Sequence, residues 1–288
     1  MKVRRYDKTS DFFPRVRALL EAREAAHNLP LGLLMRSVQD PPPTEQESRH
    51  FLALAETAEG DVPLGMIMTP PYNVIVFGAG ELLQPAIEAA VSYVLREGVP
   101  VPGVIGEKDV ALRFARSWQA QTERAFTVQM EQMIYRLDRV NEVPSCPGTF
   151  LRAGEEHLDL VTEWMVGFSE ITPHPVERPE ARERMERRIG EGQLYLWCDG
   201  EPVSMAWQAR PTKSGVVVSG VYTPPEHRRR GYATCCVAAL SQQLLDEGYS
   251  YCALYTDLSN PTSNSIYQKI GYRPVCESTM YRFEADRV

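Results

Sequence analysis

A short basic stretch at residues 228–233 (Arg-Arg-Arg-Gly-Tyr-Ala) has the residue types that could hold a phosphate group. It follows an apolar, β-branched run and opens a segment whose apolar residues recur at helical spacing. N–H groups at a helix start lack intrahelical acceptors, and the helix dipole adds positive charge there. Gly231 and Ala233 are small enough for a close backbone approach, and arginines add charge-assisted hydrogen bonds. The stretch predicts a phosphate-binding loop; a solvated basic turn before a helix is the alternative.

A second stretch, residues 260–272, has the signals that begin and end a short helix. It follows an apolar run at 251–256 that is typical of a buried strand. Asn260 or Ser263 can cap the helix, and a glycine after its last residue can end it. Tyr267 lies inside this helix. It is either a packed tyrosine with a solvated hydroxyl or a proton donor.

Together, the two stretches resemble motifs of the GNAT N-acetyltransferase superfamily. The first is similar to motif A, whose Arg-x-x-Gly-x-Ala pattern is met by Arg228, Gly231 and Ala233. The second is similar to motif B, with Asn260 and Tyr267 at the matching positions and a Gly-Tyr pair after them. The resemblance covers the second half of the chain and implies that acetyl-CoA is a cosubstrate and that no metal is used.

In this family, motif A binds the pyrophosphate of acyl-CoA, and the strand before it offers freed backbone groups to the pantetheine arm. The asparagine of motif B helps to hold the pantetheine or the phosphate side of CoA, and the tyrosine lies near the thioester sulfur. The residues that the resemblance assigns to cofactor binding are Val221, Thr223, Arg228, Arg229, Arg230, Gly231, Tyr232, Ala233, Thr234, Asn260, Asn264 and Tyr267.

The resemblance also implies three catalytic roles. Tyr267 would protonate the leaving thiolate, since a phenol of pKa near ~10 can donate to a thiolate whose conjugate acid has a pKa near ~8.5. The N–H of Val221 would stabilise the oxyanion, and Gly220 beside it favours a bulge or a close backbone approach. The strand at 216–223 has no carboxylate, so we take Glu170, in the helix–loop region that borders the acceptor site, as the first choice for the general base. A solvated surface glutamate is the alternative.

The chain also repeats itself weakly. Residues 131–138 align with residues 277–284, an offset of 277 − 131 = 146. Two prolines in the segment 143–148 prevent regular structure there. A period this long indicates a duplicated domain, with chance similarity of amphipathic strands as the alternative. The expected organisation is a degenerate GNAT-like domain at 1–140, a linker at 141–148 and a catalytic GNAT domain at 149–288.

The predicted fold class is α/β (α+β), with two GNAT-like domains that each have a mixed, mostly antiparallel central sheet flanked by helices. We expect a helix over 82–97 with Gly98 as its C-cap, and a counterpart after Gly231 with Gly248 as its cap. The first half lacks the motif residues. Its segment matching motif A has Glu81 and no arginine, so we expect that this half does not bind CoA and that it walls the acceptor cleft or acts as an internal dimer partner.

Composition limits the partners. The net charge of −7 argues against a general nucleic-acid binder. We expect no membrane-spanning segment and no secretory signal, because no apolar run is long enough. The six cysteines form no Cys-x-x-Cys pair, so we expect reduced thiols and a cytoplasmic protein.

The sequence thus predicts an acetyl-CoA-dependent N-acetyltransferase that acetylates a primary amine of a small molecule or peptide by direct transfer. The expected state is a monomer with an internal pseudo-dimer, or a homodimer. The alternative is a non-catalytic acyl-CoA-binding sensor or scaffold protein.

Overall fold

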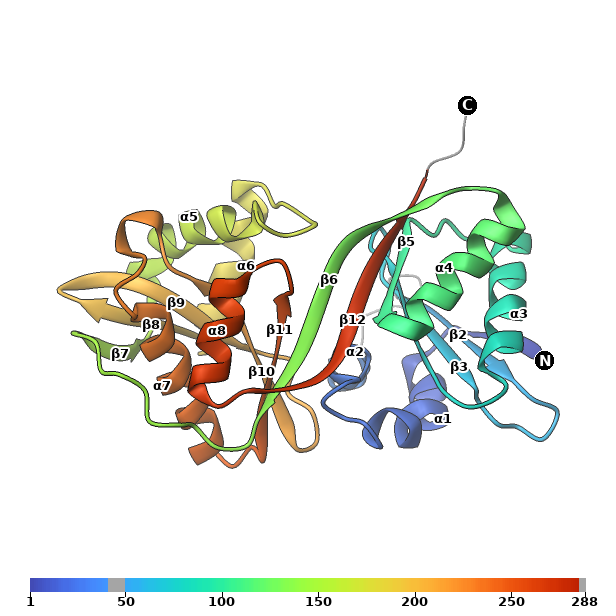
Figure 1. Cartoon of the computed structure of the whole chain (residues 1–288), viewed down its shortest axis with the longest axis horizontal. Helices are drawn as coiled ribbons and strands as arrows, with labels where there is room; N and C mark the ends of the chain where they lie inside the picture. The colour runs from blue at the N-terminus through green and yellow to red at the C-terminus, as the bar shows by residue number, and fades with distance from the viewer. Residues whose placement is uncertain (41–49, 285–288) are drawn as a thin grey trace. The chain divides into compact units, whose positions relative to one another are not determined.

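A computed structural model of the chain describes residues 1–40 and 50–284. The chain divides into two compact units: unit 1 comprises Met1–Met133 and Cys276–Val288, and unit 2 comprises Ile134–Val275 (Figure 1). Among the described residues, no helix has both the length and the apolar composition needed to cross a membrane.

Unit 1 places its helices on both faces of a mixed sheet. Its strands are β1 (Lys2–Tyr6), β2 (Phe51–Glu56), β3 (Leu64–Met68), β4 (Val74–Gly78), β5 (Gly103–Glu107), the first part of β6 (Phe126–Leu137) and most of β12 (Arg273–Phe283). Its helices are α1 (Thr9–Glu21), α2 (Asn28–Gln39), α3 (Leu83–Arg96) and α4 (Lys108–Thr122). The strand order is β1-β2-β3-β4-β5-β12-β6, in which only β4 and β5 are known to be parallel.

The side chains of β2 alternate between two hydrophobic clusters that form the core of unit 1. Because successive side chains of a strand point to opposite faces, Ala53 and Ala55 face one way and Leu52 and Leu54 the other. The alanines join the cluster formed with α3 and α4, whereas the leucines join the cluster formed with α1 and α2. Both faces of β2 are therefore buried, which explains its continuous apolar run.

Along the chain, unit 2 has the same order of helices and strands as unit 1. Its strands are the end of β6, β7 (Thr149–Arg152), β8 (Leu194–Asp199), β9 (Glu201–Ala209), β10 (Gly215–Tyr222) and β11 (Tyr251–Asp257). Its helices are α5 (Leu158–Ser169), α6 (Arg178–Gly190), α7 (Tyr232–Asp246) and α8 (Pro261–Ile270), with short 3-10 helices at Glu155–His157 and Pro225–His227. The strand order is β6-β11-β10-β9-β8-β7. Pairs from β7 to β10 are antiparallel, and β10 and β11 are parallel.

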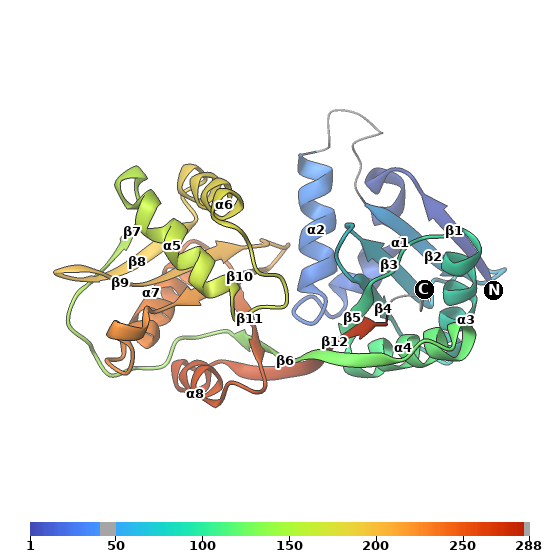
Figure 2. The ribbon, with the colours of Figure 1, turned by 90° about the horizontal axis from the view of Figure 1, so that it is seen from above.

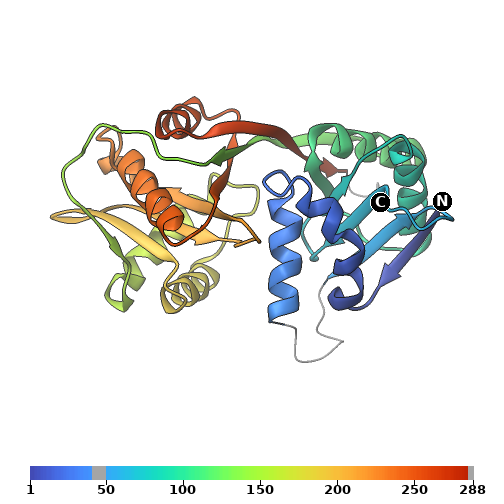
Figure 3. The same cartoon turned by 90° about the horizontal axis from the view of Figure 1, so that it is seen from below.

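The helices of unit 2 cover opposite faces of its sheet. Figures 2 and 3 show α7 and α8 on one face and α5 and α6 on the other. The thiol of Cys252 in β11 donates to the carbonyl of Ser241 in α7, so Cys252 marks the face toward α7. By alternation, Tyr251, Ala253 and Tyr255 lie on the face toward α5 and α6.

These elements confirm the predicted fold class: both units have a mixed sheet flanked by helices. The helices expected around 82–97 and after Gly231 are α3 and α7, and residues 143–148 have no helix or strand. The division into units differs from the boundary expected from the sequence, because residues 134–140 belong to unit 2 and residues 276–284 to unit 1. The physical reason is the pairing of β12 with β5, from Ser278–Glu107 to Arg282–Gly103.

Candidate active site

Strands β10 and β11 separate soon after they begin. Their parallel ladder comprises three pairs, from Gly215–Tyr251 to Val217–Ala253. β10 continues to Tyr222 and β11 to Asp257, so each strand extends beyond the last pair. Backbone groups that leave a ladder need another partner. The gap between these strand ends is a place where an extended ligand can pair with the backbone.

Gly220 interrupts the regular structure of β10. The register between β9 and β10 shifts between Ser219 and Tyr222, and Gly220 has a positive φ of 59°. A side chain at Gly220 would be strained, and its Cβ would overlap the indole ring of Trp207. The bulge expected from the sequence is therefore present, and it re-aims the backbone of Val221.

The basic loop follows β10 directly. The Nε of Arg228 donates to the carbonyl of Thr223 at 2.9 Å, and the hydroxyl of Thr223 lies 2.9 Å from that of Ser204 in β9. Arg228, Arg229 and Arg230 are all exposed. These contacts hold the loop against the end of the strand and leave three guanidinium groups near the start of α7.

Free N–H groups collect where α7 begins. Its first intrahelical bond runs from the N–H of Cys235 to the carbonyl of Gly231 at 3.0 Å. The N–H groups of Tyr232, Ala233 and Thr234 precede that bond and have no acceptor one helical turn earlier. Gly231 adopts a positive φ of 86°, which turns the chain into the helix. The arrangement has the donors and the charge that a diphosphate requires.

The segment after β11 carries the motif B residues. The side chain of Asn260 accepts a hydrogen bond from the N–H of Ser263 at 3.1 Å, which confirms the predicted cap of α8. Gly271, with a φ of 114°, ends the helix as expected. The amide of Asn264 donates to the carbonyls of Asp257 and Asn260, so this side chain holds the start of α8 against the end of β11.

Tyr267 lies on α8 and is 8% exposed. Its ring packs edge-on against Tyr272, with 6.0 Å between ring centroids. Among residues 1–40 and 50–284, its hydroxyl forms no hydrogen bond. Burial raises the pKa of Tyr267 to about 12. The phenol is thus protonated at neutral pH and available to a ligand.

Glu170, the candidate base, is an exposed residue that directly follows α5. His174 and Glu177, in the loop that leads to α6, are exposed as well. Among residues 1–40 and 50–284, the Glu170 carboxylate forms no hydrogen bond or ion pair with the motif residues. Its role as a base stays a prediction.

Aromatic side chains line the face of the sheet toward α5 and α6. Trp207 in β9 packs edge-on against Phe168 of α5 at 5.6 Å, and the guanidinium of Arg188 in α6 lies 4.5 Å from the Trp207 ring. Trp164 of α5 lies 6.3 Å from Tyr222 at the end of β10. This wall borders the separated strands on the side opposite α7, where an acceptor could reach a thioester. The sequence did not single out Trp164, Phe168, Arg188 or Trp207, since apolar residues at helical or strand spacing are typical of ordinary core positions.

In unit 1, the corresponding place between β4 and β5 is a pocket of about 710 Å³. It is lined by Gly78, Ala79 and Gly80 and by charged pairs. Arg23 binds the Glu107 carboxylate at 2.6 Å, and His27 lies 3.0 Å from the same oxygen. Burial raises the pKa of Glu107, but hydrogen bonds from His27 and Arg23 outweigh burial and bring it below its usual value. A half-buried, ion-paired carboxylate therefore lines the pocket of unit 1 that corresponds to the β10–β11 gap of unit 2.

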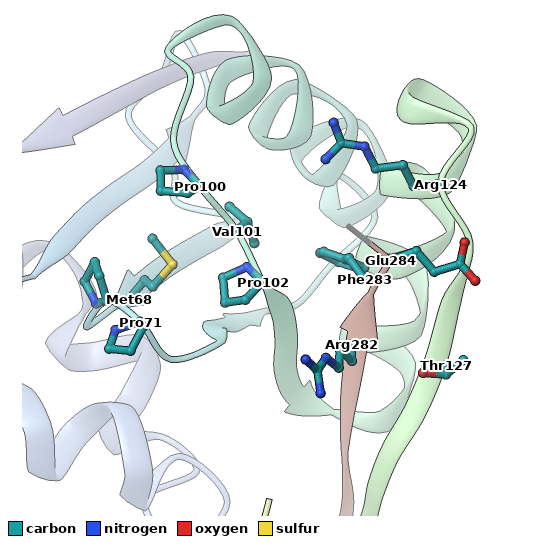
Figure 4. A pocket seen from close by; sticks show the side chains of 11 residues that line it. Met68, Pro71, Pro100, Val101, Pro102, Arg124, Thr127, Arg282, Phe283 and Glu284 are labelled. Carbon is teal, nitrogen blue, oxygen red and sulfur yellow. The ribbon is translucent and has the colours of Figure 1, made fainter. Parts of the chain in front are cut away.

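A second pocket of unit 1, of about 660 Å³, lies among the segments 68–71, 100–102, 124–127 and 282–284 (Figure 4). Its walls are mainly apolar, with four prolines, Met68 and Phe283, and Arg282 and Arg124 lie at its edge. It contains none of the residues that the sequence analysis assigned to binding or catalysis. No reaction centre is apparent there.

One expectation about the cysteines is wrong. The structure joins Cys146, in the segment between the repeats, to Cys235 in the first turn of α7 by a disulfide, with their Cα atoms 6.6 Å apart. The segment passes close to the helix start, since a Cβ on Gly231 would lie 3.7 Å from the Cβ of Cys146. The pair is 89 residues apart in sequence, so no local spacing could reveal it. The other four cysteines are free.

Comparisons with known proteins agree with this architecture. A family model described as FR47-like protein matches residues 197–282. A GCN5-related N-acetyltransferase from Sphaerobacter thermophilus is 14% identical, with 98% of this chain and 94% of that chain covered and a TM-score of 0.66. A GNAT-family acetyltransferase from Colwellia psychrerythraea is 11% identical, with coverage of 99% and 100% and a TM-score of 0.61. A tandem GNAT protein from the clavulanic acid biosynthesis pathway is also 11% identical, with coverage of 99% and 100% and a TM-score of 0.59. No curated protein matches the chain.

These findings confirm the resemblance inferred from the sequence: the chain has the fold of the GNAT superfamily. The family match lies in the second half of the chain, from the end of β8 to β12, and includes both motif stretches. At these low identities, the solved structures show the fold alone.

Proposed function

We propose that unit 2 is an acetyl-CoA-dependent N-acetyltransferase that transfers the acetyl group directly to a primary amine of a small molecule or peptide. One observation carries the proposal. The ladder between β10 and β11 ends at Val217 and Ala253, and the two freed strands lead into the two motif segments. β10 leads to the arginine loop and the start of α7, and β11 leads to Asn260 and Tyr267 on α8.

The cosubstrate would occupy this gap in an extended conformation. The residues we assign to acetyl-CoA binding are Val221, Thr223, Arg228, Arg229, Arg230, Gly231, Tyr232, Ala233, Thr234, Asn260, Asn264 and Tyr267. The N–H groups at the start of α7 and the arginines would bind the diphosphate, and the freed backbone of β10 would pair with the pantetheine amides. Tyr232 would contribute its N–H, since its hydroxyl already donates to Asp199 at 2.5 Å.

Transfer would need no covalent enzyme intermediate. The neutral amine attacks the thioester carbonyl and forms the C–N bond, while the carbonyl oxygen becomes an oxyanion that the N–H of Val221 stabilises. When the C–S bond breaks, the sulfur takes the electron pair and Tyr267 donates a proton to it. Glu170 accepts the proton that the amine nitrogen loses. Holding both reactants in one cleft supplies much of the rate.

Unit 1 would not bind the cosubstrate, because the segment after β4 has Glu81 and no arginine. In the corresponding pocket the cationic Arg23 is already paired with Glu107. The net charge of −7 argues against a nucleic-acid partner. We place the activity in the cytoplasm and expect a monomer or a homodimer, which sedimentation of the purified chain would measure.

The test is turnover of acetyl-CoA with a panel of amines, including amino acids, polyamines, aminoglycosides and peptide N-termini. CoA release is followed with a thiol reagent and the product by mass spectrometry. N-acetylated product formed together with CoA supports the proposal. Acetyl-CoA binding with no acetylation of any amine would contradict it and favour the alternative, an acyl-CoA-binding sensor or scaffold.

A further inference from the structure

The side chain of Arg210 has no charged partner. It lies just after β9, and it forms no hydrogen bond or ion pair with any residue of 1–40 or 50–284. Its Nε is buried without an acceptor, although the residue as a whole is partly exposed. A guanidinium can only donate, so a buried N–H without an acceptor costs free energy unless a ligand supplies one.

The position of this guanidinium points to the acceptor side of the site. Its central carbon lies 5.8 Å from the centroid of the Tyr255 ring. Tyr255 lies two residues beyond the last pair of the β10–β11 ladder and on the face opposite α7. Arg210 is therefore beside the separated strands, on the face of the sheet that carries the aromatic residues Trp164, Phe168 and Trp207.

A second donor on the same face also lacks an acceptor. The indole Nε1 of Trp207 is buried with no hydrogen-bond partner among the described residues. Trp207 packs against α5 and α6, which places it on the face that Tyr255 shares. Two unpartnered donors on one face favour a ligand that brings acceptor atoms.

Two other arginines of this face are already engaged. Arg136 lies over Tyr251 at 4.1 Å and binds Asp138, and Arg188 lies over Trp207 and donates to the carbonyl of Gln208 at 3.3 Å. Among the three arginines, Arg210 alone has neither a carboxylate nor a carbonyl partner. Burial lowers the pKa of Arg210, and a bound anion would offset that effect.

We infer that Arg210 binds a carboxylate of the acceptor, so that the preferred substrates of unit 2 are amines that also carry a carboxylate group. This inference rests on the proposed acetyltransferase function. Arginine offers a planar pair of N–H donors that matches the two oxygens of a carboxylate. Arg210 would therefore select the acceptor and set its orientation, without itself taking part in proton transfer.

The test compares matched amines that differ only in this group. L-leucine, β-alanine and 4-aminobutanoate are each paired with the corresponding amide, and kcat/KM is measured at saturating acetyl-CoA. We expect the carboxylate member of at least one pair to be preferred by roughly 10-fold or more, since hydrogen bonds to charged groups are the stronger kind. In Arg210→Gln this ratio should fall to about 2-fold or less, whereas Lys213→Gln, an exposed charge in the same turn, should keep it.

Two further measurements and two contrary outcomes complete the test. Calorimetry should show that Arg210→Gln binds acetyl-CoA with about the wild-type affinity. If this variant does not fold, Arg210→Lys is used instead, because lysine keeps the charge but lacks the planar pair of N–H donors. Its preference for the carboxylate member of each pair should be smaller than that of the wild type. Equal turnover of both members of every pair, or a preference that survives in Arg210→Gln, would overturn this inference alone. Acetylation of no amine at all would overturn the proposed function, and the inference with it.

Discussion

The carbonyl of Thr223 accepts a hydrogen bond from the Nε of Arg228 at 2.9 Å, which ties the phosphate-binding loop to the end of β10. The bond uses one nitrogen of the guanidinium, and the two terminal nitrogens form no hydrogen bond with residues 1–40 or 50–284. Arg228 therefore has two tasks in this account: it shapes the loop, and it contributes charge where the diphosphate would bind.

Reversal of charge in this loop should abolish cofactor binding. In Arg228→Glu combined with Gly231→Asp, two carboxylates would face the diphosphate at the start of α7. We expect the affinity for acetyl-CoA to fall by about 100-fold or more, because each lost charge-assisted bond costs about 1.5–3 kcal/mol. Calorimetric titration with acetyl-CoA measures this affinity. Lys213→Glu, a charge reversal at an exposed residue outside the loop, is the control, and an unchanged affinity in the double variant would refute the loop assignment.

Removal of the Tyr267 hydroxyl should slow the reaction without weakening cofactor binding. A positioned proton donor contributes about 10²–10⁴-fold to a rate. We therefore expect Tyr267→Phe to lower kcat by about that factor and to bind acetyl-CoA with nearly wild-type affinity. Tyr272→Phe is the matched control, since its hydroxyl lies 2.8 Å from Ser241 inside the core and should affect stability instead. Comparable losses of turnover and affinity in Tyr267→Phe would mean that Tyr267 only packs.

The raised pKa of Tyr267 also predicts a pH dependence of stability. Burial raises this pKa to about 12, above the unfolded value near ~10, so the folded state holds the proton more tightly. The contribution is fully present below pH ~10 and is lost as pH rises toward ~12. Between those pH values, the wild type should lose about 1–3 kcal/mol more of unfolding free energy than Tyr267→Phe. Denaturant unfolding of both proteins at several pH values measures this difference, and parallel curves would contradict it.

The bulge at Gly220 should tolerate no side chain. Gly220→Val would place a β-branched residue at a φ of 59° and against the Trp207 ring. We expect a loss of about 1–3 kcal/mol of stability and a higher KM for acetyl-CoA, because the backbone of Val221 would be displaced. Gly190→Ala is the control, since the space around Gly190 is open. If Gly220→Val has wild-type stability and KM, the bulge is not required.

The chain should bind one molecule of acetyl-CoA. Unit 1 has Glu107, paired with Arg23, in the pocket that corresponds to the CoA site. Calorimetry should give a stoichiometry of one for the wild type and no binding for the Arg228→Glu, Gly231→Asp double variant. A stoichiometry of two, or residual tight binding in the double variant, would show that unit 1 binds acetyl-CoA as well.

Local patterns were enough to predict much of this structure. The cap at Asn260, the glycine stop at Gly271 and the bulge at Gly220 all depend on neighbouring residues, and each is present. The cofactor-binding residues could be proposed for the same reason, since both motifs are continuous in the sequence.

Contacts between distant residues could not be predicted in this way. The pairing of β12 with β5 and the Cys146–Cys235 disulfide join segments whose sequences give no sign of each other. The unpartnered guanidinium of Arg210 belongs to the same group, because a missing partner becomes visible only when the surrounding residues are placed.

A single-turnover experiment tests the central claim most directly. Wild-type protein in excess is mixed with trideuterated acetyl-CoA and an amine that it acetylates, and the label is followed by mass spectrometry on both the amine and the protein. Direct transfer in unit 2 predicts that the labelled acetyl group appears on the amine in step with CoA release, with no acetylated protein at any time. Label on a protein side chain before it reaches the amine, or CoA release with no labelled amine, would contradict the account.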